Sequence, residues 1–134
     1  MTSRRAQLVL AWAPALAYMG VIWALSSMEL GSISVSRFPL GDKGVHVVEY
    51  ALLGFLVAHA TRASWPRHHP MRTALFAIFV TCVWGFVDEI HQAMVPGRTS
   101  EALDLVADFT GATAGALLRY APLMIPRVAA QEER

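Results

Sequence analysis

A stretch of 20 residues without a single charged side chain, residues 6–25, constrains this chain more than any other feature. A helix of about 20 apolar residues is long enough to cross the hydrocarbon core of a bilayer. Because lipid offers the backbone no hydrogen-bond partners, such a stretch has to satisfy its own N–H and C=O groups, which a helix does. The sequence therefore predicts a membrane-spanning helix at about residues 6–26.

Three further apolar segments follow, at about residues 45–61, 73–92 and 102–125, and each carries some polar residues. Only 16% of the 134 residues are charged, whereas soluble domains carry about 25%. A chain of this length has room for one domain. We therefore predict an all-α fold, a four-helix transmembrane bundle that forms a single domain over residues 1–134.

Two other interpretations of the apolar segments find less support. A cleaved signal peptide fits the short basic start, but the first apolar stretch is long, no small-x-small cleavage site stands out, and more apolar segments follow. A soluble helical bundle is disfavoured by the span lengths and by the uneven distribution of basic residues. We expect a multi-pass protein of the bacterial inner membrane.

Basic residues predict the orientation, because loops on the cytoplasmic side carry an excess of lysine and arginine. With four spans, one side of the membrane receives the N-terminus, the second connection and the C-terminus. Three of the 11 basic residues fall on the other side, namely Arg37, Lys43 and Arg98. The remaining eight predict that both termini are cytoplasmic: Arg4, Arg5, Arg62, Arg67, Arg72, Arg119, Arg127 and Arg134.

Acidic residues gather at the opposite, outward side of the predicted bundle. Eight of the ten lie there: Glu29, Asp42, Glu49, Asp88, Glu89, Glu101, Asp104 and Asp108. Helical spacing arranges polar and small residues of this end in three stripes, since positions three or four apart share a face. The stripes are Asp42, His46 and Glu49, with Tyr50 beside them; Glu89 and Gln92; and Asp104, Asp108, Gly111 and Gly115.

An ionisable side chain within a membrane costs about 3 kcal/mol unless it is paired or hydrated. Glu49 and Asp108 lie one to two turns inside their predicted helices, so we expect them to face the bundle interior or a water-filled pocket. Lys43 and Arg98 would partly offset the carboxylates. Arg98 is either an ordinary loop cation or a ligand for phosphate or carboxylate. The binding candidates are Asp42, Lys43, His46, Glu49, Tyr50, Glu89, Gln92, Arg98, Asp104 and Asp108, while Gly111 and Gly115 are expected to pack helices.

Other kinds of site find little support. No short metal-binding motif such as H-E-x-x-H is present, and Glu89 and His91 diverge on a helix, so we predict no metal and no cofactor. Asp88 and His91 are expected to face water at a helix end. Ser26, Ser27 and Ser100 lack the context of a catalytic nucleophile. No basic tract is present, which disfavours nucleic acid as a partner.

Two separated motifs resemble one family. Residues 42–54, DKGVHVVEYALLG, resemble the D-K-x-x-H-x-x-x-Y-x-x-L-G signature of the VanZ-like family. Residues 88–115 resemble its second block, with the elements E-x-x-Q, P-G-R and D-x-x-x-N-x-x-G. The chain departs from the pattern at Asp108, where the family usually has Asn, so detailed mechanism is not carried over. The resemblance covers the second, third and fourth predicted helices in order.

The resemblance implies a small polytopic membrane protein of the bacterial cell envelope, and the family's namesake is linked to low-level resistance to glycopeptides such as teicoplanin. The expected partners are membrane lipids and a lipid-linked cell-wall precursor or anionic head group. An alternative is an interfacial hydrolase or transferase, with acid–base groups from His46, Glu49, Glu89 and Asp104. A proton- or ion-coupled transporter fits poorly, because the cytoplasmic half offers only His59 and a few threonines.

Overall fold

The computed structural model describes residues 3–28, 40–98 and 100–124, with side chains described up to residue 122. Within these ranges the chain forms four helices and no strand. They are α1 (Arg4–Ser26), α2 (Gly41–Ser64), α3 (Pro70–Gln92) and α4 (Ala102–Met124). The predicted all-α fold with four helices is confirmed. Three of the basic residues on which the predicted orientation rests, Arg37, Arg127 and Arg134, lie outside the described residues, as does Glu29 of the predicted outward acidic set.

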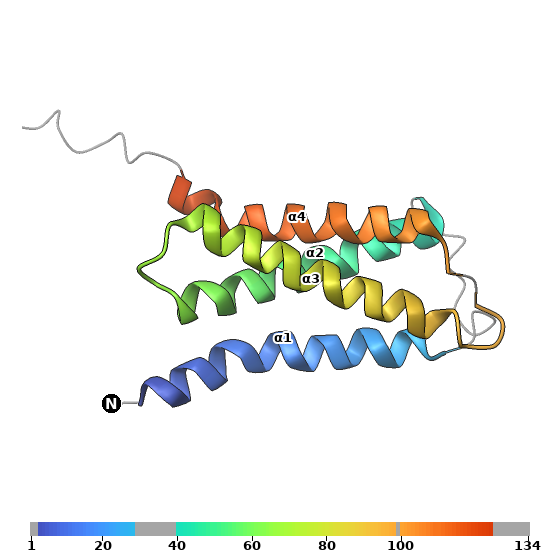
Figure 1. Cartoon of the computed structure of the whole chain (residues 1–134), viewed down its shortest axis with the longest axis horizontal. Coiled ribbons are helices and arrows are strands. Elements are labelled where there is room, and N and C mark those ends of the chain that lie inside the picture. The colour runs from blue at the N-terminus through green and yellow to red at the C-terminus, as the bar shows by residue number, and fades with distance from the viewer. Residues whose placement is uncertain (1–2, 29–39, 99, 125–134) are drawn as a thin grey trace, which may run out of the picture.

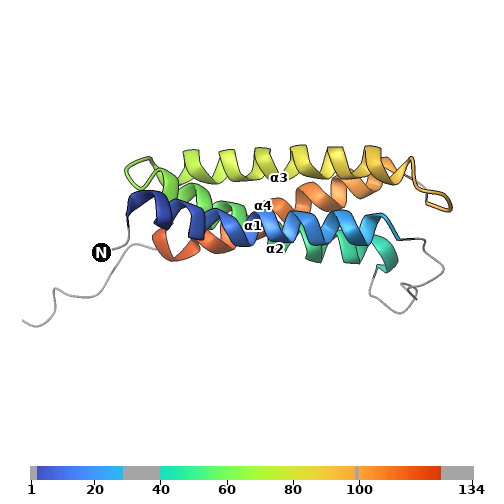
Figure 2. The same ribbon diagram turned by 90° about the horizontal axis from the view of Figure 1, so that it is seen from below.

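The helices run alternately in opposite directions along one axis (Figure 1). The start of α1, the α2–α3 turn and the end of α4 lie at one end of the bundle, and the start of α2, the end of α3 and the start of α4 lie at the other (Figures 1 and 2). The most extensive packing joins α2 to α4. Helix α1 packs against α2 and α3 and, within the described residues, does not contact α4.

Helix α2 begins at Gly41, four residues before the predicted position 45, and ends at Ser64 rather than at 61. Its first turn contains Asp42, whose negative charge suits the positive end of the helix dipole. Helix α3 begins at Pro70, three residues before position 73, because proline is well tolerated in the first helical turn, where its missing N–H is not needed. Polar residues at these starts therefore belong to the helices.

Three helices, α1, α2 and α3, are long and apolar enough to cross a membrane. Helix α4 carries Asp104, Asp108 and Arg119 along its 23 residues, and its role as a fourth span stays a prediction. Large apolar side chains on the outside of the bundle are exposed, among them Leu10, Phe79 and Leu118. Such an outer surface fits contact with lipid better than contact with water.

The interface between α2 and α4 is made of small residues. A Cβ atom added at Gly111 would collide with the backbone carbonyl of Val47, and one at Gly115 with that of Ala51. Between them, Ala112 faces Gly54, where an added Cβ would lie 2.5 Å from the alanine carbonyl oxygen. Small residues that let helix backbones approach this closely are typical of membrane helix pairs. The two helices are held in one register by this shape.

Candidate functional site

Buried polar side chains from all four helices gather at the end of the bundle where α2 and α4 begin and α1 and α3 end. We call this set the polar cluster, and each of its members is at most 7% exposed: Ser26, His46, Asp88, Glu89, Gln92, Asp104 and Asp108. Four carboxylates in one buried set is unusual, because burying an ionised carboxylate is costly unless it is paired. Each buried carboxylate therefore requires a compensating partner.

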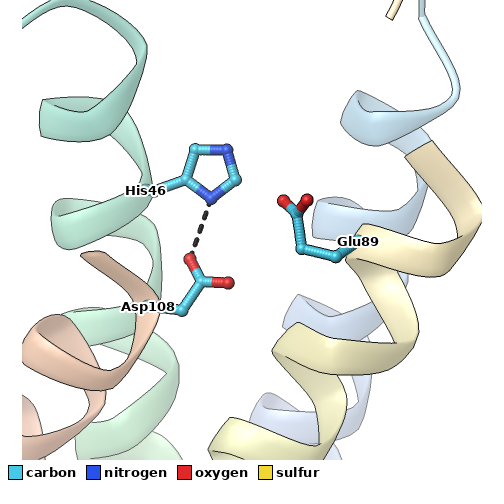
Figure 3. Close-up of side chains that lie close together, drawn as sticks. All are labelled: His46, Glu89 and Asp108. Carbon is cyan, nitrogen blue, oxygen red and sulfur yellow. Dashed lines mark hydrogen bonds and ion pairs between the residues drawn. The ribbon is translucent and has the colours of Figure 1, made fainter. Parts of the chain in front are cut away.

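At the centre of the polar cluster, three side chains from three helices face one another (Figure 3). His46 on α2 and Asp108 on α4 lie 2.8 Å apart, measured from the imidazole Nδ1 to a carboxylate oxygen, Oδ1. Glu89 reaches toward this pair from α3, and one nitrogen or oxygen atom of each residue lies within 4.8 Å of the others. The Tyr50 ring lies parallel to the His46 ring, with centroids 6.3 Å apart.

The local backbone explains how these three groups meet. Gly111 and Gly115 bring α4 against α2, which sets Asp108 beside His46. On the facing helix α3, Gly85 leaves room for the aspartate, since an added Cβ would lie only 2.8 Å from Asp108 Oδ2. Asp108 is the residue that departs from the usual Asn of the resembling family. Its carboxylate therefore occupies a space that glycines on two helices create.

A second group of charges surrounds Lys43 at the rim of the polar cluster. The Lys43 ammonium contacts Asp104 at 2.7 Å, Glu101 at 2.9 Å and Asp42 at 3.4 Å, in each case measured from Nζ to a carboxylate oxygen. Asp104 is buried, whereas Asp42 and Glu101 are exposed. An ammonium has three N–H donors, and three carboxylates receive them here. Lys43 thus pairs with carboxylates at the rim and not with those at the centre.

Asp88 belongs to the cluster, although the sequence led us to expect it to face water. That expectation is wrong, because Asp88 is 1% exposed. Ser26 on α1 donates a hydrogen bond of 2.7 Å to Asp88 Oδ2, and the Gln92 amide donates another of 3.0 Å to the same oxygen. The end of α1 therefore covers this face of α3 and is tied to it.

His91 lies at the end of α3, as expected, but it is not simply solvated. Its ring stacks on Trp23 of α1, with centroids 3.8 Å apart and planes inclined by 18°. Its Nε2 atom also lies 2.9 Å from the Ser27 hydroxyl. Both contacts join α1 to α3, so His91 contributes to the same attachment as Asp88.

Arg98 holds the end of α1 in place. Its guanidinium donates hydrogen bonds to the backbone carbonyls of Leu25, at 3.0 Å, and Met28, at 3.2 Å. A longer contact of 3.4 Å joins it to Gln92 Oε1. Carbonyls at the end of a helix lack partners within the helix. Arg98 supplies hydrogen-bond donors to two carbonyls at this end. The guanidinium is thus engaged with the protein itself.

The remaining predicted residues divide between the site and its surroundings. Glu49 is half-buried on α2, and within the described part of the chain it forms no hydrogen bond or ion pair. Asp42 lies on the exposed rim, although it shares a helical stripe with His46. The structure therefore brings His46, Glu89 and Asp108 together and leaves Glu49 and Asp42 outside this centre.

Sequence reasoning did not select Asp88, Ser26 or Ser100. Ser100 donates a hydrogen bond of 2.6 Å to Glu89 Oε2 from the turn before α4. Asp88 and Gln92 are four residues apart, so their spacing held a signal that both share a helix face. Neither serine carries such a signal, because each meets its partner only through the packing of different helices.

Three carboxylate oxygens of the polar cluster are buried and, among the described residues, lack a hydrogen-bond partner: Asp88 Oδ1, Glu89 Oε1 and Asp108 Oδ2. Buried polar atoms in folded proteins nearly always have a partner. A group that brings hydrogen-bond donors or a positive charge would complete these oxygens. These oxygens are therefore suited to accept hydrogen bonds in binding, and the buried Tyr50 hydroxyl, which also lacks a partner among the described residues, offers a donor.

Comparison with known proteins gives one match. The family model described as VanZ/LLP1 matches residues 3–124, which includes all four helices. No curated protein and no solved structure matches the chain. The match spans both sequence motifs and the helices that carry the polar cluster. The chain belongs to the VanZ/LLP1 family.

Proposed function

We propose that this chain is a multi-pass protein of the bacterial plasma membrane in which all four helices span the bilayer and the polar cluster faces outward. There it binds the polar part of a lipid-linked cell-wall component and lowers susceptibility to glycopeptides such as teicoplanin. The proposal rests on family membership and on three apolar helices that fit a membrane protein. The cluster at one end of the bundle supplies the binding groups.

One observation carries the binding role, namely the buried carboxylate oxygens that lack partners at Asp88, Glu89 and Asp108. Polar groups this expensive to bury in a membrane protein usually serve function. Free carboxylate oxygens accept hydrogen bonds, so they suit hydroxyl, amide or amino groups, which cell-wall sugars and peptides carry. Direct capture of a phosphate is less well supported, because Lys43 and Arg98 are engaged by protein acceptors.

Expression in a glycopeptide-sensitive bacterial host tests this function. The wild-type chain should raise the inhibitory concentration of teicoplanin, and Glu89→Gln should abolish the rise, since it removes one of the accepting oxygens at the centre. Glu101→Gln is the matched control, because Glu101 is exposed at the rim, and it should preserve most of the effect. No change on wild-type expression, at membrane levels verified by immunoblot, would contradict the proposal.

The orientation can be tested separately through the chain's single cysteine. In a Cys82→Ala background, Met94→Cys places a thiol in the exposed turn after α3, and Arg67→Cys places one in the exposed α2–α3 turn. A membrane-impermeant maleimide added to intact spheroplasts should label position 94 and not position 67. The opposite pattern would reverse the orientation and put the polar cluster in the cytoplasm.

An interfacial enzyme is a second candidate, favoured by the hydrogen bond between His46 and Asp108 beside Glu89. A carboxylate that orients an imidazole is a frequent arrangement in acid–base catalysis. Purified protein would be incubated with lipid-linked precursors and the products identified by mass spectrometry. A product that wild type forms and His46→Gln does not form would support this candidate, whereas identical product profiles would remove it.

A further inference from the structure

We propose that His46, Glu89 and Asp108 form a binding site for a single divalent metal ion, with Zn²⁺ as the best-suited probe. The three residues come from α2, α3 and α4, and one potential ligand atom of each lies within 4.8 Å of the others. The inference does not depend on a lipid-linked ligand or on glycopeptide resistance. It concerns only what completes the centre of the polar cluster.

The charge at this centre argues for a cation. Two carboxylates lie beside one imidazole, and both are at most 3% exposed. The two basic side chains nearest in the fold are committed elsewhere, Lys43 to the rim carboxylates and Arg98 to carbonyls of α1. Glu89 and Asp108 therefore receive no lysine or arginine among the described residues. A divalent ion would supply the missing positive charge.

Two unpartnered oxygens point to the same conclusion independently of charge. Asp108 uses Oδ1 for His46 and leaves Oδ2 buried without a partner in the described structure. Glu89 accepts a hydrogen bond from the Ser100 hydroxyl at Oε2, and its Oε1 is also buried without a partner in the described structure. Each carboxylate thus keeps one oxygen available. The hydrogen bond from Ser100 orients Glu89 in the way that outer partners of metal ligands commonly do.

The geometry is close to that of an occupied site. Zinc bonds to histidine nitrogen and carboxylate oxygen are about 2.1 Å long, so two ligand atoms of a tetrahedral ion lie about 3.4 Å apart. Side-chain rotations that bring the ligand atoms closer by about 1.4 Å would close the present spread of up to 4.8 Å. Three protein ligands leave a position open for water or a substrate, which is the pattern of catalytic zinc sites.

The donor set narrows the metal. One imidazole with two carboxylates and no thiolate suits Zn²⁺, and to a lesser degree Mn²⁺. Mg²⁺ prefers oxygen ligands in octahedral geometry and keeps several waters, so it fits poorly beside a buried imidazole. The sequence shows no metal motif because its three ligands are separated by 43 and 19 residues along the chain, which is read directly from positions 46, 89 and 108.

The test uses the full chain in detergent, stripped of metal with a chelator that is then removed. Zn²⁺ binding is measured by calorimetry and by metal analysis after dialysis. Wild type should bind one ion per chain, and Mg²⁺ at the same concentration should not compete. Asp108→Asn and Glu89→Gln should each weaken Zn²⁺ binding by more than about tenfold, since even outer partners of ligands are worth that much.

Matched controls separate this site from general attraction of cations. Glu101→Gln and Asp42→Asn remove the same charge from the exposed rim, and each should leave Zn²⁺ affinity within about twofold of wild type. The double variant His68→Gln, His69→Gln removes the exposed histidine pair of the α2–α3 turn and should also bind normally. The visible spectrum of bound Co²⁺ should change with His46→Gln and not with these controls.

Several results would overturn the site. Absence of Zn²⁺ binding to the wild-type chain would do so, as would loss of binding in the His68 and His69 variant. Equal loss in the rim variants and in Glu89→Gln would show a diffuse acidic surface. Should Asp108→Asn fail to fold, Glu89→Gln decides alone, because its retained amide oxygen can still accept from Ser100. An unchanged susceptibility phenotype with Zn²⁺ bound would contradict the proposed function and leave the metal site standing.

Discussion

Helix α4 carries one buried stripe whose two halves face α2 in different ways. Asp104 and Asp108 form its carboxylate half, and Gly111 and Gly115 form its glycine half. In the glycine half, backbone meets backbone, and no space remains for a single methyl group. In the carboxylate half, charged side chains reach Lys43 and His46 across the same interface. One helix face therefore performs two tasks within about three turns.

Shape and charge are separable in this bundle. Membrane helices associate through close packing, because lipid provides no hydrophobic driving force between them. The glycine half supplies that packing. Burial of the carboxylate half costs free energy, and it provides a set of oriented oxygen atoms. Substitutions in the first half should damage the fold, and conservative substitutions in the second should damage binding.

The largest expected effect is that of Gly115→Ala. The new Cβ would collide with the backbone carbonyl of Ala51, which cannot move without shifting α2, so we expect a loss of about 2–3 kcal/mol. This loss of stability is measured by thermal unfolding in detergent, with the folded fraction determined by size-exclusion chromatography. Gly20→Ala on α1 is the control, because nothing lies within 4 Å of its added Cβ. Equal stability of Gly115→Ala and Gly20→Ala would contradict the role of the glycine half in packing α4 against α2.

The next effect belongs to the carboxylate half. Lys43→Met leaves Asp104, whose side chain is 4% exposed, without its cation, and we expect a loss of about 2 kcal/mol. The double variant Lys43→Met, Asp104→Asn should recover at least half of this loss, because no buried charge remains uncompensated. A double-mutant cycle from thermal unfolding measures the coupling. Additive losses would mean that the ion pair contributes nothing to the rim.

A smaller effect concerns the attachment of α1. Ser26→Ala removes the 2.7 Å hydrogen bond to buried Asp88 and should cost about 1 kcal/mol. Ser27→Ala changes the neighbouring, exposed serine and should cost less than half of that. Chemical unfolding of the purified variants provides the comparison. A larger loss for Ser27→Ala would shift the attachment of α1 from Asp88 to His91.

The smallest effect distinguishes charge from geometry at Arg98. Arg98→Lys keeps the positive charge but cannot bridge two carbonyls with a planar fork, so we expect a loss of about 0.5–1 kcal/mol. Arg98→Gln removes the charge as well and serves as the comparison in the same thermal assay. Similar losses of stability in Arg98→Lys and Arg98→Gln would confirm that Arg98 acts as a cap on α1. A much larger loss for Arg98→Gln would show that its charge balances the carboxylate half.

Much of the fold could be predicted from local pattern. Uninterrupted apolar stretches indicate helices of membrane length, and positions four apart place Asp104, Asp108 and the glycines on one face. The predicted starts at 45 and 73 lie a few residues inside the observed helices, because the charged residues Asp42, Lys43 and Arg72 interrupt the apolar pattern in the first turns. Helix ends are where pattern is weakest, since capping and turns decide them.

The candidate site was predictable only in part. Spacing along one helix relates His46 to Asp42 and Glu49, yet its partner in the structure is Asp108, 62 positions away. Likewise the sequence allows Arg98 to be either a loop cation or a ligand for phosphate or carboxylate. In the structure its guanidinium binds a backbone carbonyl of α1. A pattern within one helix cannot reveal which face of another helix it meets. That depends on crossing geometry, which the small residues between α2 and α4 set.

Helices of membrane length and acidic residues gathered toward one end could be predicted from the sequence alone, because hydrophobicity and helical periodicity are local properties. Only the tertiary structure decided that Asp88 is buried, that Lys43 and Arg98 are engaged, and that His46, Glu89 and Asp108 converge. The physical reason is that charge compensation is a property of contacts between helices, and contacts follow from packing.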